Sequence, residues 1–349
     1  MAKVRGKKAR GFFDYEFRKD EIKNQQTSLE KLNTLINWEK FRSTIEGVFD
    51  KQSKGPGGAP AFDRLFMFKI LVLQRYFNLS DAQTEFQIKD RISFQSFLGL
   101  DICDDVPDEK TIWYFREQLI HSGALKYLFE MFTGFLDDQG IISKEGSIVD
   151  ASFVEAPRQR NSREENKQIK EGAVPEAWEE KQSKLSQKDT DAKWTKKNNE
   201  VHYGYKNHVK VDKKTKLIQS FTVTDASVHD SQTVADMINE GDKELYGDSA
   251  YKSEAIDKEL GSKHINNQVH EKGYRNKPLT EIQKAGNKIK SKIRVSVEHV
   301  FGFIENSMKG SNTRYIGFKR NKTRICITNL VYNLFRYEQI MRLNLAGAN

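Results

Sequence analysis

The sequence predicts an α/β protein in which an all-α N-terminal domain precedes a domain with a mixed sheet flanked by helices. Apolar residues recur at helical spacing through residues 28–140. From about residue 147, short segments rich in β-forming residues alternate with amphipathic helical segments. The 349 residues leave room for two domains of roughly 150 residues each. A mixed sheet covered by helices is the architecture that this order of elements favours.

The N-terminal part reads as several short helices joined by polar turns. Residues 62–79 carry apolar side chains close to the 3.6-residue period of a buried helix. Ser80 and Gln83 predict a capping box at the start of the next helix. Another helix is expected over 108–120, directly after Pro107. This arrangement is compatible with a helix-turn-helix-like module that binds DNA, and equally with a plain helical scaffold.

The C-terminal part alternates strands and helices. The expected strands are 147–156, the hairpin 202–211 with 217–224, the buried strand 243–251, and 262–270. The expected helices are 231–240, 253–260, 281–308 and 322–343.

Residues 157–200 interrupt this pattern as a charged insertion. They contain eleven Lys and Arg, nine Asp and Glu, and few aliphatic residues, so they do not form a core element. Either some helix or a disordered loop fits this composition. Trp178 and Trp194 indicate that the insertion folds back on something.

The composition favours a polyanionic partner. The formal net charge is +9, which suits nucleic acid or an acidic membrane face. No apolar run approaches the ~20 residues that span a bilayer, and the basic N-terminus lacks the apolar stretch of a secretory signal. Cys103 and Cys326 lie far apart and form no C-x-x-C pair, which excludes a zinc ribbon or a disulfide framework. We therefore expect a cytoplasmic protein that binds nucleic acid and has no membrane partner.

Three carboxylates stand out by their placement. Asp150 is expected to end the first strand, Asp248 to end the later buried strand, and Glu298 to lie in the helix 281–308. An acid at the end of a buried strand carries a desolvation cost, so two such acids near a third need a reason. Hard divalent cations supply one, because Mg²⁺ binds carboxylate oxygens together with substrate phosphates. Two such ions support an in-line phosphoryl displacement.

The helix around Glu298 has a buried stripe and a polar flank. Arg294 and Glu298, four residues apart, share the flank beside that stripe. Arg294 is expected to hold a phosphate or to orient Glu298. Spacing alone favours the alternative of an ordinary surface ion pair. The stripe consists of Ile293, Val297, Val300, Phe301, Ile304 and Met308.

Several segments together resemble a known family. The chain resembles the transposases of bacterial insertion sequences, most closely insertion-sequence family five, in the segments IVDASFVEAP, GYKNHV, DASVHDS, LYGDSAY and VEHVFGFIE, in that order. The helical segments around 62–119 resemble the N-terminal domain of those proteins. The resemblance covers roughly residues 40–340.

This resemblance implies an RNase H-like catalytic domain with an Asp-Asp-Glu triad at Asp150, Asp248 and Glu298. These residues would be both catalytic and metal-ligating, with two Mg²⁺ or Mn²⁺ ions as cofactors. Water would cut the phosphodiester at the transposon end, and the freed 3′-hydroxyl would attack target DNA without a protein nucleophile. Transposon-end and target DNA are the implied partners, a homodimer is expected in the synaptic complex, and a bacterial, nucleoid-associated location is implied.

The chain departs from the fuller family pattern at two positions. Related transposases often carry Tyr three residues before the Arg and a basic residue seven after the Glu, whereas Ser291 and Glu305 stand there in this sequence. Lys309 is one turn later and is a candidate substitute for the missing base. The departure puts in doubt the hairpin-forming strand chemistry that accompanies the fuller pattern.

Basic residues flank the candidate site. Residues 271–294 hold eight Lys and Arg against two Glu, and residues 309–324 hold six basic residues and no acid. Contacts with the DNA backbone are the interpretation that we favour over a merely solvated face. The candidate DNA-binding residues are Lys206, Lys288, Lys290, Lys292, Arg294, Lys309, Arg314, Lys319 and Arg320. For Lys206 a structural role is equally expected. His208 and His229 have no partners at metal-ligand spacing, so ligation is not expected.

These observations predict a basic flexible tail over 1–20 and a helical domain for DNA binding or dimerisation over 21–140. The family resemblance implies an RNase H-like catalytic domain over 141–346, with the insertion at 157–200. Two alternatives to a transposase stay open. One is a Mg²⁺-dependent RNase H-like nuclease without strand transfer. The other is a DNA-binding regulator without catalysis.

Overall fold

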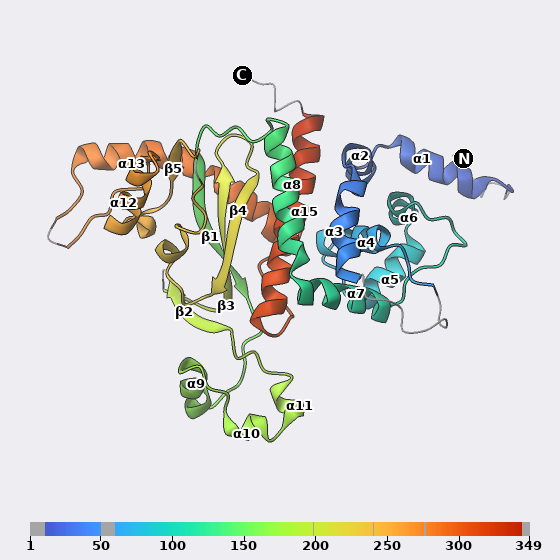
Figure 1. The fold of residues 1–349 in the computed structure, drawn as a ribbon, viewed down its shortest axis with the longest axis horizontal. Coiled ribbons are helices and arrows are strands. Elements are labelled where there is room, and N and C mark those ends of the chain that lie inside the picture. Colours follow the sequence, from blue (N-terminus) through green and yellow to red (C-terminus); the bar gives the residue numbers. More distant parts are fainter. Residues whose placement is uncertain (1–10, 50–59, 198, 240, 276, 344–349) are drawn as a thin grey trace, which may run out of the picture. The chain divides into compact units, whose positions relative to one another are not determined.

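The structure, a computed structural model, describes residues 11–49, 60–197, 199–239, 241–275 and 277–343 (Figure 1). The chain forms two compact units, which are described separately. The first comprises Met1–Gln74 and Leu79–Glu117, and the second comprises Arg75–Asn78 and Gln118–Asn349. The predicted mixed α/β fold, with a helical N-terminal region and a mixed sheet, is confirmed.

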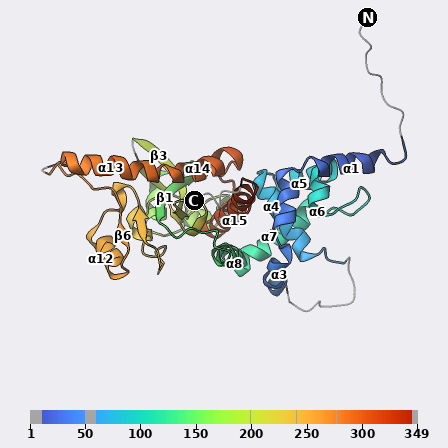
Figure 2. The ribbon, with the colours of Figure 1, turned by 90° about the horizontal axis from the view of Figure 1, so that it is seen from above.

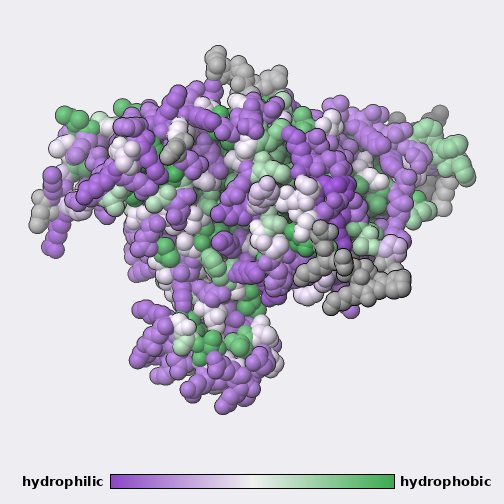
Figure 3. Space-filling model, in the orientation of Figure 1, coloured by the Kyte–Doolittle hydropathy of each residue, from purple (hydrophilic) through white to green (hydrophobic). Residues whose placement is uncertain are grey.

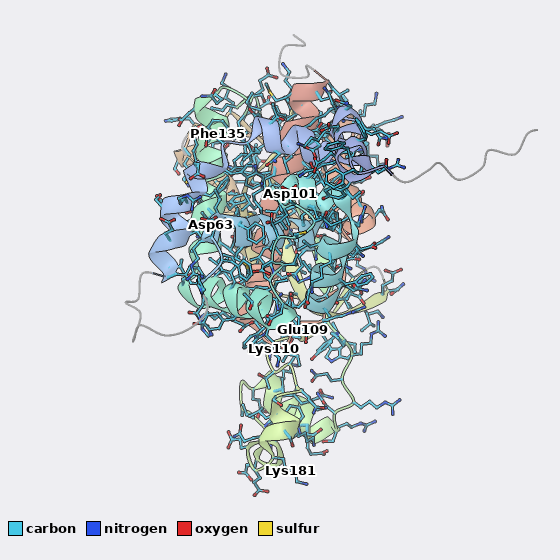
Figure 4. The ribbon with its side chains drawn as sticks, turned by 90° about the vertical axis from the view of Figure 1, so that its right-hand side faces the viewer. Asp63, Asp101, Glu109, Lys110, Phe135 and Lys181 are labelled. Atoms are coloured by element: carbon cyan, nitrogen blue, oxygen red, sulfur yellow. The ribbon has the colours of Figure 1, made fainter. Side chains whose placement is uncertain are left out.

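The first unit is helical. Its helices are α1 (Asp14–Asn24), α2 (Ser28–Leu35), α3 (Arg42–Phe49), α5 (Asp81–Asp90), α6 (Ile92–Leu98) and most of α4 (Arg64–Tyr76) and α7 (Glu109–Ser122). Aromatic pairs fill its core, including Trp38 against Phe97 and Phe41 against Phe68. Asp63, labelled in Figure 4, accepts a hydrogen bond from the first turn of α4. Helix α1 begins inside the predicted tail, whose residues 1–10 lie outside the described residues.

The predicted capping box is present at the start of α5. The hydroxyl of Ser80 accepts a hydrogen bond from the backbone N–H of Gln83, and the Gln83 side chain accepts one from the backbone N–H of Ser80. Two N–H groups that the helix itself leaves unpaired are thereby satisfied. A local sequence pattern therefore predicted this helix start correctly.

A six-stranded mixed sheet forms the centre of the second unit. Its strands are β1 (Ser147–Glu155), β2 (Lys193–Lys197), β3 (Glu200–Asp212), β4 (Ile218–Asp225), β5 (Glu244–Tyr246) and β6 (Asn266–Asn267). The order is β2-β3-β1-β5-β6, and β4 pairs with β3 as well. β1 and β3 are antiparallel, whereas β5 runs parallel to both β1 and β6. The predicted hairpin is confirmed as β3 and β4, and β2 was not predicted.

Helices α8 (Ala124–Asp138) and α15 (Phe318–Arg342) pack on each other and on β4 (Figure 1). The contact is partly polar: the buried side-chain amides of Asn207 on β3 and Asn329 on α15 hydrogen-bond each other. The side chain of Asn333 binds both the N–H and the carbonyl of Ile218. Buried amides need such partners because an unpaired one is costly. Because α8 packs on α15 and β4, it belongs to the second unit. The sequence pattern had grouped it with the N-terminal helices.

Two predicted helices differ from the structure. Residues 231–240 were expected to be helical, but in the described part of this segment, which ends at residue 239, only a 3-10 turn at Asp230–Thr233 forms. The single helix expected over 281–308 is divided into α13 (Glu281–Arg294), α14 (Ser296–Gly302) and a π-helical turn. Figure 2 shows α13 and α14 following nearly the same line. Helix α12 (Glu254–Ser262) agrees with the prediction.

The insertion is folded around one tryptophan. It contains α9 (Arg163–Lys170), α10 (Glu176–Glu179) and α11 (Gln182–Leu185). Trp178 is fully buried, and its indole N–H donates to Glu165 at 2.6 Å. The visible surface here is mostly hydrophilic (Figure 3), and Lys181 lies at the outer end (Figure 4). Of the two alternatives for the insertion, the structure shows short helices and not a disordered loop.

Two simpler expectations concern membranes and cysteines. Within the ranges that the structure describes, no helix is long and apolar enough to cross a membrane. Cys103 is exposed and Cys326 is buried, and both are free thiols.

Candidate active site

The register of the two parallel strands brings Asp150 and Asp248 to one edge of the sheet. β1 pairs with β5 through Ile148 opposite Tyr246. Asp150 and Asp248 each follow two residues after their member of that pair. The sequence predicted that Asp150 ends its strand. This prediction is wrong, because β1 continues to Glu155. Asp150 lies instead just beyond the point where the neighbouring strand β5 stops.

The prediction that Asp248 ends β5 is also wrong, because the strand stops at Tyr246; the turn that follows β5 fixes Asp248 instead. It is the N-cap of a 3-10 turn, and its Oδ1 accepts a hydrogen bond of 2.8 Å from the N–H of Ala250. The preceding residue, Gly247, lies close to two side chains, which would have to shift slightly to admit a larger residue. A Cβ on Gly247 would lie 3.2 Å from both Val149 and Tyr251. The glycine therefore allows the turn to approach β1 closely.

Arg294 connects two of the three carboxylates. Its Nη1 donates to Oδ2 of Asp150 at 2.8 Å, and its Nη2 lies 3.5 Å from Oε1 of Glu298. Helix α14 positions Glu298 by burying Val297 and Val300 while α14 packs against β1. The Glu298 side chain itself is 58% exposed. The expected i, i+4 ion pair is thus present, and it extends to an acid that is distant in the sequence.

The electrostatics of the edge centre on Asp150, which is only 9% exposed. Burial raises the pKa of its carboxyl to about 6, and the nearby charge of Asp248 acts in the same direction. The Ala151 N–H and the Arg294 guanidinium oppose this rise. A second positive charge at this point would stabilise the ionised form.

Two residues at this edge were missed by sequence reasoning. Tyr251 is fully buried, and its hydroxyl has no hydrogen-bond partner among the described residues. Burial, followed by the charges of Asp150, Asp230 and Asp248, raises its pKa well above the ordinary value. Burial and then Arg294 lower the pKa of His270, which Asp248 opposes. Neither residue stands at a distinctive spacing in the sequence, so only the fold reveals them.

The side chains fit a divalent cation in chemistry but not yet in arrangement. Carboxylate oxygens are the ligands that Mg²⁺ and Mn²⁺ prefer. Among the described residues, however, no three His, Cys, Asp or Glu side chains converge closely enough to hold a metal ion. The cation that lies between Asp150 and Glu298 is the Arg294 guanidinium. A positively charged group thus already occupies the place between two of the three carboxylates.

Comparison with protein families shows which family the chain belongs to. Residues 142–334, more than half of the chain, match the family model described as "Transposase DDE domain". The chain belongs to the DDE transposases. Residues 16–118 of the transposase match a second model, "Transposase domain (DUF772)". A solved structure, the piggyBac transposase synaptic complex with hairpin DNA, aligns with 11% identity and a TM-score of 0.42, over 91% of this chain and 75% of that one.

Membership of this family has direct consequences. The protein is a DNA transposase of the DDE type, and its family is generally dependent on divalent metal ions. The matched segment contains Asp150, Asp248 and Glu298. The exposed Glu298 and the edge formed by the other two acids therefore belong to the DDE domain of the transposase.

On β3, the strand that pairs with β1, the transposase contains a buried ionic network. Lys206 is buried, and its Nζ donates to Oδ1 of Asp230 at 2.8 Å and to the carbonyl of Val228 at 2.7 Å. His208 is also buried, with a pKa lowered to about 4, chiefly by burial. Its Nε2 lies 2.9 Å from the Thr224 hydroxyl. The contacts of Lys206 with Asp230 and Val228 favour the structural role over the phosphate contact, the two roles that the sequence left open.

The other predicted DNA-binding residues divide by exposure. Lys290 donates to the carbonyl of Val269, and Arg294 pairs with Asp150. The remaining ones are exposed: Lys288, Lys292, Lys309, Arg314, Lys319 and Arg320. The exposed residues lie on α13, on the loop before α15 and on its first turn.

A pocket of about 570 Å³ opens beside β1. The rings of Phe153 and His202 stack in its wall with centroids 3.9 Å apart. Glu305, which stands where the family pattern has a basic residue, lines the same pocket. Lys309 is exposed in the following loop and does not line it. The sequence carried no signal for this pocket, because its residues come from four separate segments.

Proposed function

We propose that this transposase cuts DNA at transposon ends and joins the freed ends to target DNA, with Asp150, Asp248 and Glu298 as metal ligands. The observation that supports this best is the strand register. Two acids that are distant in the sequence follow the aligned residues of β1 and β5, and Arg294 joins one of them to Glu298. The mixed sheet with flanking helices supports an RNase H-like catalytic domain at 141–346.

Two bound Mg²⁺ or Mn²⁺ ions would activate the attacking oxygen and neutralise charge on the phosphate. The protein's own part is to supply oxygen ligands and to hold the DNA backbone. Asp150 offers a buried carboxylate, whereas Asp248 is held by its turn. Glu298 is exposed enough to move toward an ion beside them. No protein nucleophile is required, since water and then the 3′-hydroxyl are the attacking groups.

The partners follow from charge and family. We propose that the exposed basic residues of α13 and of the loop before α15 bind backbone phosphates. The first unit would supply DNA binding or dimerisation, and two ends would be held by a homodimer. Assignment to bacterial insertion-sequence family five, with a cytoplasmic and nucleoid-associated location, is part of the same proposal and rests on the ordered motifs of the sequence.

The test uses a supercoiled plasmid that carries the coding segment of the chain together with its natural flanks. We expect wild-type protein with Mg²⁺ to cut at the segment ends and to link them to target DNA, and we expect EDTA to abolish both reactions. Asp248→Asn should bind the DNA without cutting it. The matched control is Asp236→Asn, which neutralises an exposed acid outside the site and should cut normally.

The outcomes separate the alternatives. Cutting without any joining would identify a nuclease. Unchanged biological function in Asp248→Asn would identify a DNA-binding regulator. Cutting that persists in EDTA would contradict the metal-dependent mechanism itself.

A further inference from the structure

The guanidinium of Arg294 is incompletely satisfied where it lies. Nη1 has one good hydrogen bond, to Asp150, and Nη2 has one long contact of 3.5 Å, to Glu298. Nε is buried and has no acceptor among the residues that the structure describes. A buried donor without a partner carries a desolvation cost. Arg294 would therefore gain hydrogen bonds from a ligand with several oxygens.

Each of the two carboxylate oxygens of Asp150 accepts one hydrogen bond. Oδ1 accepts from the N–H of Ala151, and Oδ2 accepts from Arg294. A buried carboxylate needs a counter-ion, because an uncompensated buried charge is strongly destabilising. Arg294 provides that counter-ion here. The positive charge of Arg294, whose Nη1 lies 2.8 Å from Oδ2, would repel a metal ion from that oxygen as long as Arg294 stays there.

A DNA phosphate is the natural alternative partner for Arg294. The planar guanidinium matches two phosphate oxygens at once, more closely than it matches one oxygen of each of two carboxylates. Arg294 is the last residue of α13, and its side chain is 23% exposed, so it has access to solvent. The exposed Lys288 and Lys292 lie on the same helix and would attract a backbone to this end.

We propose that Arg294 is a positioning residue that neutralises Asp150 in the absence of DNA and transfers to a DNA phosphate when DNA binds, so that DNA and divalent cations bind cooperatively. This inference rests on the proposed function, since it requires Asp150 to be a metal ligand. The phosphate releases Asp150 for the cation. By thermodynamic linkage the cation must strengthen DNA binding by the same factor. The site would then acquire its metal ions mainly when DNA is present.

The test measures Mn²⁺ affinity by titration calorimetry, with and without a short DNA duplex taken from the flank of the coding segment. A titration of the duplex alone is subtracted. In wild-type protein, DNA should raise the Mn²⁺ affinity about tenfold or more, within the usual range of coupling between two sites. Arg294→Gln should bind Mn²⁺ more tightly than wild type without DNA, and DNA should add little. Lys258→Gln, which removes an exposed charge from α12 outside the proposed DNA contacts, should behave as wild type.

Two results would overturn the inference. One is equal Mn²⁺ affinity in wild type and Arg294→Gln without DNA. The other is a wild-type affinity for Mn²⁺ that is the same with and without DNA. This second measurement uses only the wild-type protein, so it does not depend on the folding of a variant. Failure of the proposed function gives a different result. In that case the Asp150→Asn and Asp248→Asn variants, each in complex with DNA, would bind Mn²⁺ as tightly as the wild-type complex does.

Discussion

Lys206 and Asp230 form a buried ion pair near the candidate active site, where the charges of Asp230 and Asp150 both act on Tyr251. Nζ of Lys206 lies 2.8 Å from Oδ1 of Asp230, and both side chains are less than a tenth exposed. Burial alone would raise the pKa of Asp230, but the hydrogen bond and charge of Lys206, together with the charges of Lys197 and His208, outweigh burial, so the pKa is lowered. The pair links β3 to the turn that follows β4, which supports the edge where Asp150 lies.

Breaking this pair should destabilise the fold. Lys206→Met leaves the buried Asp230 carboxylate with a weaker counter-ion, so we expect a loss of about 3 kcal/mol in the free energy of unfolding, measured with urea. Lys197 lies 3.5 Å from the same carboxylate but is 39% exposed. Lys197→Met should therefore cost less than about 1 kcal/mol. Equal losses in the two variants would show that burial does not determine the strength of this pair.

Gly204 should tolerate no side chain. Its φ of +145° is in the region that favours glycine, and a Cβ would lie 2.3 Å from the carbonyl oxygen of Val154. We expect Gly204→Ala to lower the stability by about 3 kcal/mol or more, because backbone atoms must move. Gly134→Ala is the control: nothing lies within 4 Å of that position on α8, so a gain of about 0.5–1 kcal/mol is expected. Thermal melts of both variants test the contrast.

Neutralising Asp150 should stabilise the protein in a pH-dependent manner. The folded pKa of about 6 exceeds the ordinary 3.8, so the native state holds the proton more tightly than the unfolded state. The stability that this group contributes is present below pH 3.8 and is lost as the pH rises through 6.

The free energy of unfolding of Asp150→Asn should therefore exceed that of wild type by about 1–2 kcal/mol above pH 6 and should equal it below pH 4. The gain is limited because Arg294 loses its charged partner. Urea unfolding across this pH range measures the difference. A gain that stays constant from pH 4 to pH 7 would contradict the raised pKa. DNA cleavage should be lost in the same variant at every pH.

The lysines of α13 should contribute to the salt dependence of DNA binding. Lys288→Gln and Lys292→Gln each remove one exposed charge that we assign to a phosphate contact. Each should reduce the slope of log K against log salt by about 1, without a change in sequence preference. Lys258→Gln on α12 serves as the control and should leave the slope unaltered. Unchanged slopes for both α13 variants would exclude this helix from the DNA interface.

Sequence patterns predicted the elements that local interactions specify. The capping box at Ser80, the β3–β4 hairpin and the helical spacing of α12 depend on residues that are near one another in the chain. The failures have tertiary causes. Strand β2 forms in a charged segment because its backbone pairs with the long strand β3. The predicted helix over 281–308 is interrupted at Val295, although its apolar stripe is almost continuous.

The candidate site divides in the same way. The sequence by itself determined which side chains can bind a hard cation and marked Asp150, Asp248 and Glu298 by their places on strands and a helix. Only the tertiary structure decided that β1 and β5 pair in the register that aligns the two aspartates, and that Arg294 neutralises Asp150. The physical reason is that a strand pattern specifies hydrophobic faces but not its partner. Pairing and ion contacts between distant residues depend on the packing of the whole domain.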